Sequence, residues 1–368
     1  MWDRPGGLSG QDGGLSYSVY NAYVRTLLRR VGGGLGRLAN GDRPGGLSHT
    51  GSPWRLSLIL LLAMAVSGPA ADFRLGIIGT DTSHVPAFTK MLNDDPSQPD
   101  HIAGARVVAA FKGGSADIEE SHSRVDRYAE EVRTKWGVEI VPNIATLLSK
   151  VDGVLLTSID GRVHLEQARP VIAAHKPLFI DKPLASTLQD AREIARLARE
   201  AGVPWFSSSS LRFGAIGASM KFPDVTGVST WGPGPMEPHH YLDLSWYAVH
   251  PIEVLYTLMG PGCESVTRTS GTDADVMVGR WKDGRIGTVR AIRPYSDYGA
   301  VVYRAKEVVE SHPKAAAATD YRPLVVEMVK FFETGKPPVP NDETLEMFAF
   351  MDAAQRSKEQ GGKPVALR

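Results

Sequence analysis

Short apolar runs alternate with helical stretches between residues 73 and 207, and this alternation constrains the fold most strongly. Leu75–Ile78, Gly153–Thr157 and Leu178–Ile180 are examples of the apolar runs. Runs of this kind are typical of strands that are buried on both faces. The stretches between them have helical periodicity and begin at capping residues such as Asn143. The alternation predicts an α/β fold, with a Rossmann-like, doubly wound parallel sheet over residues 72–210.

The pattern changes after residue 210. Gly and Pro interrupt residues 211–234, as expected where a chain passes into another domain. Val276–Trp281 and Ile286–Ile292 then flank an Asp-Gly pair, which is a strong hairpin signal. Amphipathic helical patterns complete this half. Residues 211–368 are therefore predicted to form an α+β domain with antiparallel strands.

The first 71 residues differ from the rest of the chain. Met1–Pro53 is rich in Gly, Ser and Arg, so we expect a disordered leader. Residues 55–71 then combine a basic residue, about eleven apolar residues (Leu56–Val66) and a small-residue site, as in a secretory signal peptide. Translation from near Pro53 would place this segment at the N-terminus, and an uncleaved anchor is the alternative. We expect export to the periplasm or the extracellular space, or a cytoplasmic protein if the segment is not used.

Composition excludes several classes of partner. Lys+Arg and Asp+Glu both number 41, so no excess of charge favours nucleic acid or an anionic membrane. The apolar run is too short for a stable membrane span, which needs roughly 20 residues. Cys263 is the single cysteine, which excludes an intrachain disulfide and a multi-cysteine metal site. We treat His239 and His240 as polar loop residues and expect no metal.

The run Leu178–Ser186 places chemistry at a strand end. Its strand delivers Asp181, Lys182 and Pro183 at the carboxyl edge of the sheet, where ligands bind in parallel α/β folds. A lysine that is partly desolvated there can exchange a proton with a substrate hydroxyl. A surface lysine at a strand end is the alternative interpretation.

Together with the strand and glycine turn of Arg74–His84, this motif resembles the glucose-fructose oxidoreductase / inositol dehydrogenase / MocA (Gfo/Idh/MocA) family, over residues 73–367. The resemblance implies NAD or NADP as cofactor and hydride transfer to or from a hydroxyl-bearing carbon of a sugar or polyol. It also implies an open sheet in the C-terminal domain that serves the substrate site and oligomerisation, and it leaves a homo-oligomer open. The expected partner is a small carbohydrate-like molecule.

The glycine turn departs from the Gly-x-Gly-x-x-Gly fingerprint, because residues 79–84 keep only the first glycine. A carboxylate at residue 81 would meet phosphate with like charge. Capping of the next helix by Asp81 or Ser83 is the alternative to a cofactor role. The residues that we assign to the phosphate end of the cofactor are Gly76, Gly79, Thr80, Asp81 and Ser83.

Two further loops are candidates for cofactor binding. Lys112 with Ser115 could accept a 2′-phosphate where NAD-specific proteins have an acid, and a solvated loop lysine is the alternative. Ser158 and His164 lie in the segment of residues 157–164, where the family has a strand, a proline and a helix-opening histidine; His164 matches that histidine, and Asp160 replaces the proline region. A solvent-facing His164 is equally compatible with the sequence.

The resemblance assigns Lys182 and His250 as the proton-handling pair, with Asp181 holding the lysine beside the cofactor. The family's orienting aspartate is replaced by Trp246, and Tyr247 or Glu253 could take its place. A buried structural His250 is the alternative. The predicted function is that of an NAD(P)-dependent oxidoreductase. Two alternatives stay open, namely a non-catalytic sugar-binding protein without cofactor and a cofactor-assisted glycosidase.

Overall fold

The computed structural model describes residues 72–368, apart from the side chains of residues 315 and 316. The predicted leader and its signal-like segment lie outside these residues. Both sheets belong to a single compact unit. In the described part of the chain, no helix combines the length and the apolar character needed to cross a bilayer.

The first sheet has six parallel strands in the order β3-β2-β1-β4-β5-β6, which confirms the predicted Rossmann-like fold. Its strands in chain order are β1 (Phe73–Ile78), β2 (Ala105–Phe111), β3 (Glu139–Val141), β4 (Gly153–Leu156), β5 (Leu178–Ile180) and β6 (Trp205–Ser207). The connecting helices are α3 (His84–Asn93), α4 (Glu119–His122), α5 (Val125–Trp136), α6 (Ile144–Leu148), α7 (His164–Ala173) and α8 (Leu188–Ala201).

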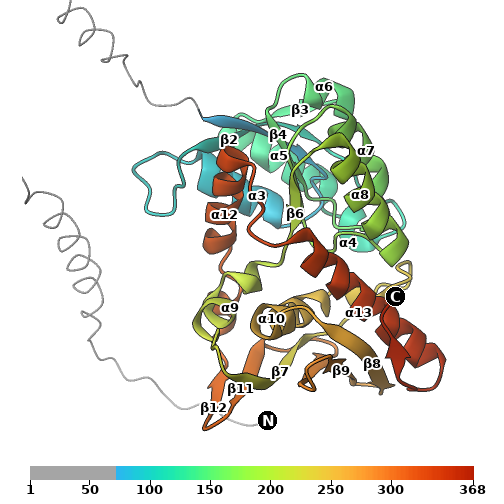
Figure 1. Ribbon diagram of the computed structural model, residues 1–368. Coiled ribbons are helices and arrows are strands. Elements are labelled where there is room, and N and C mark those ends of the chain that lie inside the picture. Colours follow the sequence, from blue (N-terminus) through green and yellow to red (C-terminus); the bar gives the residue numbers. More distant parts are fainter. Residues whose placement is uncertain (1–71) are drawn as a thin grey trace, which may run out of the picture. The chain divides into compact units, whose positions relative to one another are not determined.

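Side chains of β1 alternate between two cores. Leu75 and Ile77 face a cluster built with α3 and with α12 (Arg322–Thr334), whereas Ile78 faces the cluster built with α7 and α8. Figure 1 shows α12 beside α3 on one side of the sheet and α7 with α8 on the other. A helix from the C-terminal part of the chain therefore completes the first sheet's core.

The second sheet has seven strands in the order β12-β11-β7-β10-β9-β8-β13. Only the β7·β10 pair is parallel, so the sheet is largely antiparallel, as predicted. The strands are β7 (Val225–Pro233), β8 (Cys263–Ser270), β9 (Ala274–Trp281), β10 (Ile286–Ile292), β11 (Gly299–Arg304), β12 (Val308–Ser311) and β13 (Val365–Ala366). The other helical segments are η1 (Ser210–Arg212), α9 (Ala215–Ser219), η2 (Asp243–Ser245), α10 (Val249–Met259), α11 (Ala315–Ala318) and α13 (Asn341–Glu359).

Register in the first sheet determines where the predicted site residues lie. Ile78 pairs with Phe111 and with Leu156, and Leu156 in turn pairs with Ile180. The residues that follow these strand ends therefore share one edge of the sheet. That edge carries Gly79, Lys112, Thr157 and Asp181, which is where ligands bind in open α/β sheets.

Candidate active site

A pocket of about 160 Å³ lies beside the carboxyl edge of the first sheet. It brings together Lys182 from the β5 end, Ser83 and His84 from the start of α3, and Tyr247 and His250 from around the start of α10. Lys182 and His250 come from different halves of the chain. The complete lining is Thr82, Ser83, His84, Arg124, Ile159, Lys182, Ser210, Leu211, Tyr247, His250, Tyr295, Tyr298, Thr319 and Tyr321.

Lys182 is one of two cationic residues that line the pocket, and the other is Arg124. Its Nζ lies 5.6 Å from the centroid of the Tyr247 ring, within range of a cation–π contact. Burial lowers the pKa of Lys182, and the charge of Asp181 opposes this shift only in part. The neutral amine is therefore easier to form than on an exposed lysine, as proton transfer with a hydroxyl requires.

The carboxylate of Asp181 is held by a histidine. Nδ1 of His84 pairs with Oδ2 of Asp181, and Oδ1 accepts a hydrogen bond from the backbone N–H of Lys182 at 2.8 Å. Burial opposes ionisation of Asp181, but the charge and hydrogen bond of His84 hold its pKa below the usual value. His84 is 8% exposed and packs edge-on against Tyr321. Since Nδ1 is engaged, Nε2 is the nitrogen left for the pocket.

His250 is oriented by a serine in place of the missing aspartate. Ser209 Oγ lies 2.7 Å from Nδ1 of His250. Burial lowers the pKa of His250 well below its ordinary value, and the nearby charge of Lys182 adds to the effect. The imidazole is therefore neutral at neutral pH.

Glu253 influences His250 indirectly, through Ser209. Its carboxylate accepts hydrogen bonds from the backbone N–H of Ser209 at 2.7 Å and from Nε of Arg212 at 2.7 Å. Glu253 thus fixes the backbone that carries Ser209 and does not contact the imidazole. Trp246, at the aspartate position, packs with Ile118 and Ile159 in a small apolar cluster. A carboxylate at this position would be buried among apolar side chains, which is unfavourable.

The glycine turn after β1, which we expected to bind the cofactor, is covered by another segment of the chain. The segment of residues 112–125, here named the cover segment, continues beyond β2 and lies against this loop. The N–H groups of Gly79 and Thr80 donate to the carbonyl oxygens of Phe111 (3.0 Å) and Lys112 (2.7 Å), so β1 and β2 remain paired past their ends. Thr80 Oγ1 also donates to the carbonyl of Val125 at 2.8 Å.

Asp81 fastens the cover segment. It accepts hydrogen bonds from Ser121 Oγ at 2.6 Å and from the N–H of Ile159 at 3.1 Å, and it is fully buried. Burial raises its pKa, which these hydrogen bonds only partly offset. Asp81 therefore faces the protein's own hydroxyl and amide groups where the fingerprint has a glycine.

A second buried carboxylate holds the other end of the cover segment. Asp160 accepts from Ser115 Oγ at 2.6 Å, pairs with Arg162, and lies 3.0 Å from Nε2 of His240. Burial opposes its charge, yet these hydrogen bonds, led by that of His240, hold the pKa of Asp160 far below the usual range. His240 is 4% exposed, and its contact with Asp160 links the C-terminal half of the chain to the first domain.

The remaining predicted residues have structural contacts. A Cβ on Gly79 would lie 2.3 Å from Ser158 N, and one on Gly76 would lie 2.7 Å from Leu147, so close packing requires both glycines. Ser158 donates to Gln167 at 2.7 Å. Lys112 forms an exposed ion pair with Asp126.

His164 is fully buried, with its ring nitrogens 2.7 Å and 3.2 Å from two carbonyl oxygens. Burial lowers its pKa. The ring does not line the pocket.

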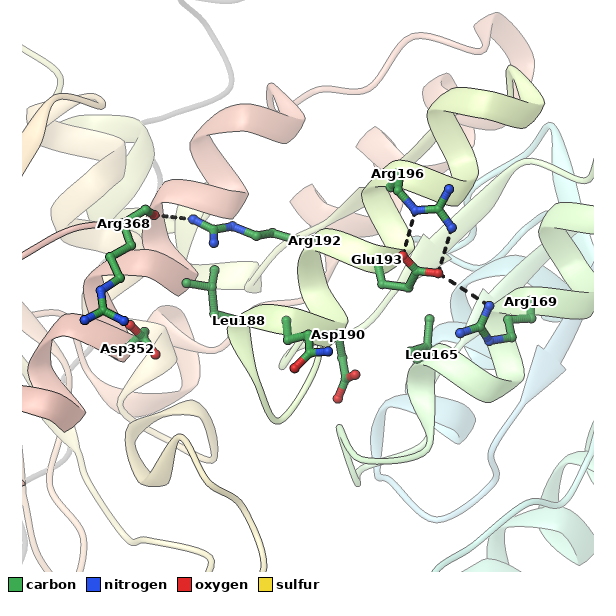
Figure 2. Close-up of a pocket in the computed structure, with 10 residues that line it drawn as sticks. Leu165, Arg169, Leu188, Asp190, Arg192, Glu193, Arg196, Asp352 and Arg368 are labelled. Carbon is green, nitrogen blue, oxygen red and sulfur yellow. Dashed lines mark hydrogen bonds and ion pairs between the residues drawn. The ribbon is translucent and has the colours of Figure 1, made fainter.

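A larger surface groove of about 640 Å³ lies between α7, α8 and α13. Three of its arginines, Arg169, Arg192 and Arg196, are engaged by carboxylates or a main-chain oxygen. Figure 2 shows Arg169 and Arg196 both directed at Glu193, and Arg192 directed at Arg368. None of the predicted site residues lines it. The described residues contain no group of three or more His, Cys, Asp or Glu side chains suited to a metal ion.

Comparison with known proteins decides the family of the first domain. Residues 73–208 match the Gfo/Idh/MocA model, an oxidoreductase family with an NAD-binding Rossmann fold. This domain belongs to the Gfo/Idh/MocA family. The prediction from the sequence is thereby confirmed, as is a nicotinamide dinucleotide as the family's cofactor.

Relatives agree with this assignment. A 1,5-anhydro-D-fructose reductase of Ensifer adhaerens is 30% identical over 122 residues, which are 33% of this chain and 37% of that enzyme. A probable dehydrogenase from Thermotoga maritima superposes with a TM-score of 0.65 at 20% identity, covering 80% of this chain and 99% of that one. The myo-inositol dehydrogenase of Lactobacillus casei, solved with NAD(H) and myo-inositol, gives 0.62 at 17% identity, covering 81% and 97%. The structural likeness extends the shared fold to both sheets.

The two ends of the glycine turn differ in how well they suit a dinucleotide. Thr82 and Ser83 line the pocket at the N-terminal end of α3, where a Rossmann fold presents backbone amides to pyrophosphate. At the other end Gly113 packs closely on Gly79, since a Cβ on Gly113 would lie 3.3 Å from Gly79 Cα. The cover segment therefore packs directly on the glycine turn.

Proposed function

We propose that this protein is an NAD(P)-dependent oxidoreductase that acts on a hydroxyl-bearing carbon of a small polyhydroxylated molecule. The observation that carries the proposal is the pocket itself, which joins Lys182 and His250 beside the start of α3. When bound, the nicotinamide ring would accept or supply the hydride. The family of the first domain and the dehydrogenase fold support this class of reaction.

The residues of the chain would handle the proton. Lys182, with its lowered pKa, is suited to take the proton of the substrate hydroxyl. His250 would hold a second substrate oxygen through Nε2, because Ser209 engages Nδ1. Tyr247 would contribute its hydroxyl at the pocket wall and its ring beneath the ammonium of Lys182. Thr82 and Ser83 would hold the phosphate end of the cofactor.

The direct test is binding and turnover with the full chain. Calorimetry with NAD and with NADP should show a dissociation constant below the millimolar range for one of them. Reduction of that cofactor should then be followed at its absorbance maximum with a panel of polyols, sugars and their acids. Absence of binding of both dinucleotides at millimolar concentration would contradict the proposal and would favour a ligand-binding protein without cofactor.

We also propose that the chain is exported, on the evidence of the sequence between Arg55 and Ala71. N-terminal sequencing of protein from its native host should give a mature end near Ala71. A mature end upstream of Arg55 would contradict export by this segment.

A further inference from the structure

The pocket contains basic groups and hydroxyls but no acid. Lys182 and Arg124 contribute positive charge, and Tyr247, Tyr295 and Tyr298 contribute phenol groups. None of the described residues that line it is an aspartate or a glutamate. A site built for a neutral sugar commonly uses carboxylates to accept hydrogen bonds from the sugar hydroxyls. This lining offers two cationic donors and several hydroxyls that can donate or accept, but no charged acceptor.

The two nearest carboxylates are already engaged. Asp181 lies behind the lining and pairs with His84. Glu120 pairs with Arg124 at 3.3 Å, across one helical turn, and both side chains are about a third or more exposed. Because exposed pairs of this kind contribute little, a bound carboxylate could replace Glu120 at Arg124 without a large loss.

Lys182 adds a second positive charge, which the charges of Asp181 and Glu120 offset only in part. Within the described residues its ammonium has a ring beneath it but no ion pair. A partly buried cation is more stable when a counter-ion approaches, because the loss of hydration is then offset. A ligand that brings a carboxylate would supply that counter-ion.

We propose that the substrate is an acid, namely a short hydroxycarboxylate or sugar acid whose carboxylate lies between Arg124 and the Lys182 side of the pocket. The pocket volume of about 160 Å³ equals the space of roughly five water molecules, which suits a compact molecule. The tyrosine hydroxyls would then bind the alcohol groups. This inference rests on the proposed function, since it takes the pocket to be the substrate site, and it adds the chemical class of that substrate.

The test compares acids with their matched alcohols. Calorimetry on the full chain without cofactor would measure glycerate against glycerol and gluconate against glucitol. At least one acid should bind tenfold or more tightly than its alcohol, and raising salt from 0.05 to 0.5 M should weaken only the acid. Arg124→Gln should remove most of this preference, and Arg124→Lys should keep much of it. Arg127→Gln, at an exposed residue of α5, is the matched control and should change nothing.

Several outcomes would overturn the inference. They are equal affinity for acid and alcohol, a preference that survives Arg124→Gln, and no binding of either acid at 20 mM. The proposed function is tested separately by cofactor reduction. Preferred binding of an acid without any cofactor reduction would support the inference and contradict the oxidoreductase. Cofactor reduction with alcohols alone would do the reverse.

Discussion

Ser209 Oγ lies 2.7 Å from Nδ1 of His250, and this contact determines which imidazole nitrogen is available to a ligand. Ser209 Oγ also accepts the N–H of Leu211 at 3.2 Å, so its own proton can be donated to Nδ1. The tautomer with a proton on Nε2 is then favoured. Ser209 thus orients the ring but favours the opposite tautomer from the one an aspartate would favour, so Nε2 of His250 is a hydrogen-bond donor toward a ligand.

Replacing this serine should slow turnover without unfolding the protein. Ser209→Ala removes one neutral hydrogen bond, so we expect kcat to fall about 3- to 10-fold. The acid limb of the pH–rate profile should also shift, because the tautomer of His250 is no longer fixed. Ser219→Ala, at an exposed serine of α9, is the control. An unchanged kcat and an unchanged pH–rate profile would show that Ser209 does not orient His250 for the reaction.

Lys182 should be needed for turnover and unnecessary for stability. If it exchanges the hydroxyl proton, Lys182→Met should reduce kcat by about two to four orders of magnitude. Burial lowers the pKa of Lys182, which means that folding disfavours its charge. The melting temperature should therefore stay level or rise. Lys90→Met is the exposed control. Full activity in the Lys182 variant would show that the assignment is wrong.

Buried histidines should make the protein sensitive to mild acid. The pKa values of His164 and His250 are both lowered by burial. Below the ordinary value of about 6.5, the unfolded chain binds protons that the folded chain does not, so stability falls as pH falls. Thermal unfolding between pH 7.5 and 5.5 should show this loss. His250→Gln should flatten the curve, whereas the exposed His122→Gln should not. A melting temperature that is constant over this range would contradict both shifts.

The sequence predicted the fold more completely than it predicted the site. Alternation of strand and helix predicted the parallel sheet, because that pattern is local. It did not reveal that α12 packs on the same sheet, since that contact joins residues far apart in the chain. Nor did it reveal that the helical stretch after β2 is interrupted between α4 and α5, where Arg124 lines the pocket.

Lys182 and His250 could be proposed from the sequence because each belongs to a short motif, and both line the pocket. His84 was missed, because its partner Asp181 lies 97 residues away and only the fold joins them. Ser209 was missed for the same reason. The sequence showed that a carboxylate at residue 81 is unfavourable beside phosphate. It could not show that Ser121, on the cover segment, would engage that carboxylate.

Asp81 and Ser121 lead to the last prediction, which concerns entry of the cofactor. The cover segment packs on the glycine turn through Gly113, so we expect its closed position to overlap the adenosine half of a bound dinucleotide. The dinucleotide would then bind only the fraction of molecules in which the segment has moved out. The apparent affinity is reduced by that fraction. Ser121→Ala removes a hydrogen bond to a buried carboxylate and should weaken the closed state. The dissociation constant for NAD should then fall about 5- to 10-fold in calorimetry. Ser123→Ala, at an exposed neighbour, should leave it unchanged.

In the unaltered protein, NAD should accelerate hydrogen exchange of the amides in residues 112–125. Equal or weaker NAD binding by the Ser121 variant, with no change in exchange, would show that the segment does not compete with the cofactor.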